Sequence, residues 1–112
     1  MKFYGSSLQG ILEAYFPDMC RMFGMPEANT LEGEPDFEWA FRLQGEPVTI
    51  YNWGNGPSCG FTIPTEEIMT FQIGGYSERA VMELINRIEM KDPLYAKITS
   101  ESSDTTHIFR KL

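Results

Sequence analysis

The most constraining feature of this chain is a strict alternation of residue types between positions 37 and 43. Large apolar side chains stand at every second position: Phe37, Trp39, Phe41 and Leu43. Successive side chains of a strand point to opposite faces, so a period of two indicates a strand with one buried face. Residues 48–53 are rich in β-branched and aromatic side chains and follow a turn at residues 44–47. The sequence therefore predicts an antiparallel hairpin with Trp39 and Phe41 in the core.

The other elements are predicted from helical spacing and from glycine and proline. Ser6 and the apolar residues after it predict a helix that ends near Pro17, and residues 18–23 add a further turn. Residues 27–36 and 54–60 are expected to be loops, the second one mobile because of its glycines. Residues 68–73 predict a third strand that Gly74 and Gly75 break, and a second long helix then runs to residue 92. Residues 94–99 predict a fourth strand, and residues 107–112 either pair as a last edge strand or hang free.

The chain length favours one domain that spans residues 1–112. Apolar residues make up 42% of the sequence, which is enough to build a core. The element order predicts an α+β fold, with an antiparallel sheet of three to five strands and two helices packed on one face.

The charge balance restricts the partners. The sequence has 16 acidic and 9 basic residues and a formal net charge of -7. This charge disfavours direct binding to duplex nucleic acid and to anionic membranes. No apolar run approaches the roughly 18 residues of a membrane span. We therefore expect a cytoplasmic protein, in the host cytoplasm if it is viral.

Residues that could carry chemistry are few. Cys20 and Cys59 have no spacing that indicates a disulfide, so both thiols are expected to be reduced. His107 is the single histidine, and no metal-ligand spacing accompanies it. The acidic pair Glu66 and Glu67 is typical of a solvated loop. The sequence predicts no enzyme activity, no metal and no cofactor.

One candidate ligand site combines a glycine turn with two aromatic side chains. Gly74 and Gly75 precede a helix with Ser77 as its N-cap and Arg79 in its first turn. Such a turn binds a phosphate if the strand ends at residue 73 and the helix begins at residue 78. Tyr51 and Trp53 would stack on a base. The alternative is structural: the glycines only turn the chain, and the aromatic side chains belong to the core.

A second candidate surface is acidic. Five carboxylates fall within twelve residues that contain no lysine or arginine, and we assign Glu32, Glu34 and Asp36 to partner binding. Such a surface would mimic nucleic acid or dock on a basic partner. The alternative is a solvated loop that aids solubility.

Four short blocks carry a resemblance to known proteins: residues 23–26 (FGMP), 39–41 (WAF), 49–53 (TIYNW) and 71–75 (FQIGG). They resemble a set of small, mostly uncharacterised bacteriophage proteins with F-G-x-P, W-x-F, T-I-Y-D-Y/W and W-x-I-G-G blocks. Asn52 and Phe71 depart from that pattern, which tends to have Asp and Trp. The resemblance implies a small phage accessory protein that binds and disables a host factor.

Three functions follow in order of preference. The first is neutralisation of a host defence component by binding, either through sequestration of an anionic nucleotide signal or through direct inhibition of a host protein. The second is a structural or assembly component of a virion, which would form a homo-oligomer with an apolar surface patch. The third is a small enzyme of unknown reaction.

Overall fold

A computed structural model describes residues 4–29, 33–60 and 63–110. It has an α+β architecture with one seven-stranded sheet in the order β2-β3-β4-β5-β1-β6-β7, and every strand pair is antiparallel. The strands are β1 (Ser7–Ala14), β2 (Glu27–Ala28), β3 (Phe37–Leu43), β4 (Glu46–Tyr51), β5 (Thr70–Gly75), β6 (Tyr95–Ser100) and β7 (Thr106–Arg110). The helices are α1 (Phe16–Phe23) and α2 (Arg79–Lys91), with 3-10 turns at Pro57–Cys59 and Thr65–Glu67. The α+β class is confirmed, but the sheet has more strands than the three to five predicted.

The predicted hairpin is confirmed as β3 and β4. Trp39 pairs with Ile50, and the inward side chains of both strands lie in the core. Trp39 is 4% exposed, and its ring meets Phe16, Phe37 and Phe71. Its indole N–H donates to the carbonyl of residue 24 at 2.8 Å, so the polar atom of this buried ring is also satisfied.

The predicted first helix is wrong, because residues 7–14 form the interior strand β1 between β5 and β6. Gly10 explains part of this difference. A Cβ at Gly10 would lie 2.6 Å from the Thr99 carbonyl oxygen and 3.2 Å from a methyl of Val81. The glycine therefore lets α2 approach the sheet closely. The apolar residues that suggest a helix instead lie on the two faces of a strand, with Leu12 on the buried face and Ile11 on the other.

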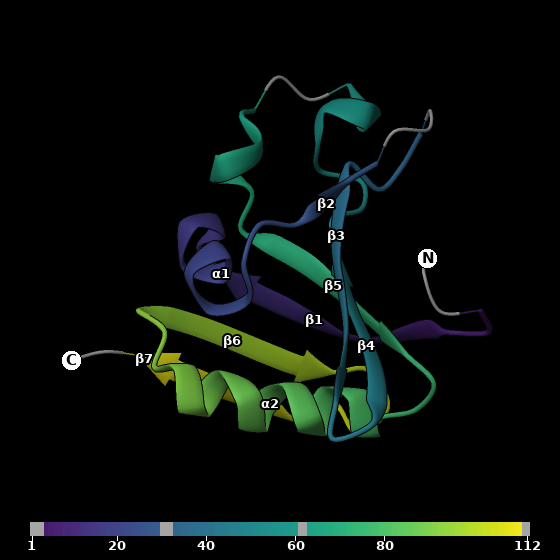
Figure 1. The fold of residues 1–112 in the computed structure, drawn as a ribbon, viewed down its shortest axis with the longest axis vertical. Helices are drawn as coiled ribbons and strands as arrows, with labels where there is room; N and C mark the ends of the chain where they lie inside the picture. Colours follow the sequence, from purple (N-terminus) through teal and green to yellow (C-terminus); the bar gives the residue numbers. More distant parts are fainter. Residues whose placement is uncertain (1–3, 30–32, 61–62, 111–112) are drawn as a thin grey trace.

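Pro17 begins a helix where the sequence predicts an end. It lies in the first turn of α1, where its missing N–H costs no hydrogen bond. The helix then continues over the residues that were expected to add only one turn. Met19 and Met22 of α1 share one core cluster with Val81 and Leu84 of α2, which places both helices on the same face of the sheet (Figure 1).

Gly74 and Gly75 do not break the third strand. Both are part of β5 and pair with β4 on one side and β1 on the other. A Cβ at Gly75 would overlap the side chain of Ala80 in α2, so the glycine is required by helix packing. The second helix, the strand β6 and the edge strand β7 are confirmed.

Candidate functional site

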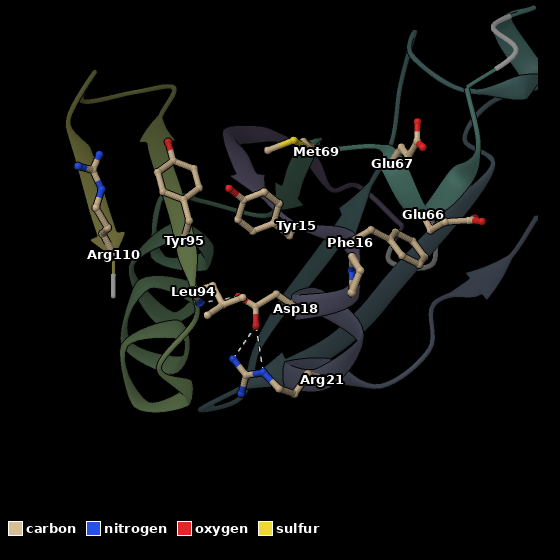
Figure 2. A pocket seen from close by; sticks show the side chains of 11 residues that line it. Tyr15, Phe16, Asp18, Arg21, Glu66, Glu67, Met69, Leu94, Tyr95 and Arg110 are labelled. Carbon is tan, nitrogen blue, oxygen red and sulfur yellow. Dashed lines mark hydrogen bonds and ion pairs between the residues drawn. The ribbon is translucent and has the colours of Figure 1, made fainter. Parts of the chain in front are cut away.

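An open cleft of about 1080 Å³ lies where the start of α1 meets the 3-10 turn Thr65–Glu67 and the start of β6 (Figure 2). Most of its lining is aromatic or aliphatic. The lining residues are Tyr15, Phe16, Pro17, Asp18, Arg21, Glu66, Glu67, Met69, Leu94, Tyr95 and Arg110. A hollow of this size and character suits a binding site.

The floor of the cleft comes from strand register. Ala14 of β1 pairs with Ala96 of β6, which brings Tyr15, the residue after β1, close to Tyr95 at the start of β6. Their ring centroids are 6.2 Å apart with planes at 57°. Tyr15 is 44% exposed, and two further apolar neighbours are equally open: Leu94 is 57% and Met69 is 41% exposed. Three large, partly exposed apolar side chains are therefore gathered around one hollow here.

The two ends of the cleft carry opposite charges. Arg110 of β7 pairs in register with Tyr95 and lies at one end, and Glu66 and Glu67 lie at the other (Figure 2). Among the residues that the structure describes, none of these three side chains makes a hydrogen bond or an ion pair. All three are exposed. They are therefore available to charged groups of an occupant.

Asp18 and Arg21, by contrast, form a structural clamp beside the cleft. Asp18 is buried, and it accepts hydrogen bonds from the Arg21 guanidinium at 2.6 Å and from the Leu94 backbone N–H at 2.8 Å. Arg21 also donates to the carbonyls of Lys91 and Asp92 at the end of α2. The clamp joins α1 to the end of α2 and to the cleft wall at Leu94.

Replacement of Arg21 by alanine is expected to lower the free energy of unfolding by about 1–3 kcal/mol. It leaves the buried Asp18 carboxylate with one donor and removes two caps from α2. Because the Arg21 side chain is 52% exposed, we expect a loss of stability in the lower part of this range. Urea titration measures it, with Arg79→Ala, an exposed arginine of α2, as the control. Equal stability of the two variants would show that the clamp contributes nothing.

The residues of the predicted nucleotide site are not brought together. Tyr51 pairs with Gln72, whereas Gly75 pairs with Val48 at the far end of β5. Gln72 and Gly75 are three residues apart on β5, which is roughly 10 Å along the strand. The strand ends at Gly75 and the helix begins at Arg79, so the geometry that phosphate binding required is absent. Nucleotide binding at this turn stays an untested prediction without that support.

Tyr51, Trp53 and Ser77 of the predicted nucleotide site differ in exposure and in their contacts. Tyr51 is only 5% exposed. Its burial raises its pKa, and the negative charge of the Glu38 carboxylate raises this pKa further. Its ring offers almost no surface for stacking. Trp53 is 52% exposed and follows β4. Ser77 is not the N-cap, which is Glu78, but its hydroxyl accepts the backbone N–H of Arg79 at 3.2 Å.

The predicted acidic surface is largely occupied by internal contacts. Asp36 accepts hydrogen bonds from the backbone N–H and hydroxyl of Ser58 and from the side-chain amide of Asn52. Burial acts to raise the pKa of Asp36, but the hydrogen bonds from Ser58 and Asn52 outweigh it, so this pKa is lowered. Glu34 accepts the backbone N–H of Gly54 and the thiol of Cys59. Glu32 lies outside the described residues.

These contacts tether the glycine-rich loop that was expected to be mobile. Ser58 and Gly54 are held by Asp36 and Glu34, and the Asn55 side chain donates to the Thr70 carbonyl at 2.9 Å. The two carboxylates therefore stabilise a loop rather than present a free charged face. Docking on a basic partner through them stays a prediction that no observation tests.

The thiols and the metal-ligating side chains form no further site. Cys20 and Cys59 are free. Burial raises the pKa of Cys20, and a hydrogen bond to the Glu34 carboxylate raises that of Cys59. Within residues 4–29, 33–60 and 63–110, no group of three His, Cys, Asp or Glu side chains is placed to hold a metal ion. No helix in these same ranges is long and apolar enough to cross a bilayer.

Sequence reasoning missed the cleft because its residues come from five separate segments. The sequence places Tyr15 inside a helix that ends near Pro17, whereas the chain forms β1 up to Ala14 and begins α1 at Phe16, and Glu66 and Glu67 are predicted only as a solvated pair. The usable signal was limited to Tyr95, near the start of one predicted strand, and Arg110, within the predicted edge strand. Comparison with protein-family models, with curated proteins and with solved structures finds no match, so the functional argument depends on the cleft itself.

Proposed function

We propose that this chain is a binding protein without chemistry, which takes up an apolar segment of a partner protein in the cleft. The observation that carries the proposal is the gathering of Tyr15, Met69 and Leu94 around one hollow, each of them more than 40% exposed. Exposed apolar surface concentrated in a concave site is typical of recognition surfaces. Its burial by a partner supplies the favourable free energy of binding.

The charges at the cleft favour a protein segment over a nucleotide. Glu66 and Glu67 repel phosphate groups at one end, and the net charge of -7 adds to this repulsion. A protein segment can meet both ends, because a basic residue would face the two glutamates and an acidic residue would face Arg110. Opposite charges at the two ends also fix the direction in which a segment lies.

This proposal supports one of the two modes of the counter-defence hypothesis. Direct inhibition of a host protein agrees with a cleft for an apolar protein segment. Sequestration of a nucleotide signal lacks the phosphate-binding turn on which it depended. The bacteriophage context and the identity of the host protein stay hypotheses.

The proposal is tested by selection of peptides from a random display library against the wild-type protein. We expect the selected peptides to contain a large apolar residue between an acidic and a basic residue. Leu94→Ser is expected to weaken their binding about tenfold or more, because it removes an open wall of the cleft. Arg110→Glu is expected to do the same through charge reversal.

The matched control is Met90→Ser, since Met90 is 80% exposed on α2 and does not line the cleft. It should leave peptide affinity unchanged. Peptides that bind the Leu94, Arg110 and Met90 variants equally well would place the site elsewhere. A selection that yields no peptide above background would count against a protein-segment occupant.

A further inference from the structure

Strand β7 is an open edge of the sheet. Among the described residues it pairs with β6 alone, and it ends the strand order. Four of its five residues are exposed, and Ile108 is 56% exposed. A row of unpaired backbone groups at such an edge is a template for another strand.

The direction of the free backbone groups follows from one hydrogen bond. The Ser100 N–H donates to the Thr105 carbonyl at 2.9 Å, which marks these two as a hydrogen-bonded pair. In an antiparallel ladder such pairs alternate with non-bonded ones. His107 and Phe109 therefore bond to β6. Thr106, Ile108 and Arg110 direct their N–H and C=O groups away from the sheet.

The opposite edge of the sheet is protected in ways that β7 is not. Strand β2 has only two residues, Glu27–Ala28, and Pro26 immediately precedes it. Short strands and nearby prolines are common means of blocking edge pairing. Strand β7 has five residues, contains no proline and shows no register shift against β6. Of the two edge strands, β7 is therefore the one better suited to pair with another strand.

We propose that β7 pairs with β7 of a second copy of this chain, antiparallel about a two-fold axis through Ile108. The free groups of Ile108 then bond to those of Ile108 in the second copy, and Arg110 bonds to Thr106 in both directions. One continuous sheet crosses the dimer. This inference does not rest on the proposed function, although Arg110 belongs both to β7 and to one end of the cleft.

The side chains of β7 are self-complementary in this register. On the open face, Ile108 meets Ile108 and Arg110 meets Thr106, so no two cations lie directly opposite each other. On the helix face, His107 lies beside Phe109, which already packs against the core. The two-fold arrangement uses the same patch on both copies, as closed dimers do.

The net charge of each copy gives a way to distinguish pairing with a second copy from pairing with a strand of another protein. Two chains of charge -7 repel each other at long range, so added salt strengthens self-pairing. An acidic strand of another protein would be attracted by Arg110, and salt would weaken that complex. The salt dependence therefore separates the two occupants.

Sedimentation equilibrium of the wild-type protein up to about 0.5 mM tests the proposal. We expect a monomer–dimer equilibrium based on the 12.8 kDa chain that strengthens with salt. Ile108→Lys places two ammonium groups on the axis and is expected to weaken dimerisation at least tenfold. Met90→Lys makes the same charge change on α2 and should behave as wild type. A wild-type monomer throughout, or equal dimerisation of the two variants, would overturn the proposal.

Amide hydrogen exchange gives a second test that needs no substitution. The amides of Thr106, Ile108 and Arg110 should become protected as the protein concentration rises. Those of His107 and Phe109 should be protected by β6 at every concentration, which makes them internal controls. Exchange at Ile108 that does not change with concentration would contradict pairing through β7.

Discussion

Replacement of Trp39 by alanine is expected to lower the free energy of unfolding by about 3–5 kcal/mol. Trp39 is 4% exposed, and its ring packs on three aromatic side chains. The substitution leaves a cavity and also removes the indole hydrogen bond to Gly24. Urea-induced unfolding followed by circular dichroism measures the loss.

Trp53→Ala is the matched control, because Trp53 is 52% exposed and makes no ring contact among the described residues. It should change the stability by less than about 0.5 kcal/mol. Similar losses for the two tryptophans would mean that the inward face of β3 is assigned wrongly.

Replacement of Asn52 by aspartate is expected to cost about 3–5 kcal/mol at neutral pH. Asn52 is fully buried, and its amide nitrogen donates to an Asp36 carboxylate oxygen at 2.6 Å. An aspartate there brings a second carboxylate against the first, and a closely placed second charge disfavours ionisation of both. The substitution is nearly isosteric, so the loss isolates the charge. Gly56 packs directly on this pair, which leaves little room for water.

The pH dependence of this variant separates charge repulsion from simple misfolding. Repulsion raises the folded-state pKa of the pair above the unfolded value of about 4, so the deficit is complete above the raised pKa. It should shrink as the pH falls from 7 toward about 4 and one carboxyl takes up a proton. The wild type shows the opposite tendency, because the lowered pKa of Asp36 gives stability that is lost as the pH falls through that pKa. A deficit that stays constant over this range would contradict the account. Asn52→Ala, which adds no charge, is the control.

The parts of the fold that sequence predicts are those decided by local pattern. The alternation around Trp39 fixes a strand face, and the spacing in α2 fixes a helix face, because each element buries one side only. Segment 7–14 has no such unique pattern. Its apolar residues satisfy a helical period, but pairing with both β5 and β6 makes it a strand. Tertiary pairing of this kind is invisible in a single sequence.

Pro17, Gly74 and Gly75 were predicted to stop elements, and all three instead lie within a helix or strand. Pro17 begins α1, and Gly10 and Gly75 let α2 approach the sheet. A glycine needed for close packing and a glycine needed for a turn look the same in a sequence. The anion site at Gly74 and Gly75 was predicted on the assumption that these glycines form a turn.

The cleft could not be predicted because its residues become neighbours only through strand order. Tyr15 and Tyr95 meet because β1 lies next to β6, a pairing across eighty residues that no local pattern contains. Asp36 illustrates the converse. Its acidity suggested a free surface, but its partner Ser58 lies in a loop 22 residues away.

Methyl NMR of the protein titrated with a selected peptide tests the central claim most directly, because the methionines report on different surfaces. Met69 lines the cleft, whereas Met82 and Met90 lie exposed on α2. The account predicts that the Met69 methyl signal shifts on binding and that those of Met82 and Met90 stay in place. Saturable binding that moves the α2 methyl signals and leaves Met69 unchanged would contradict it.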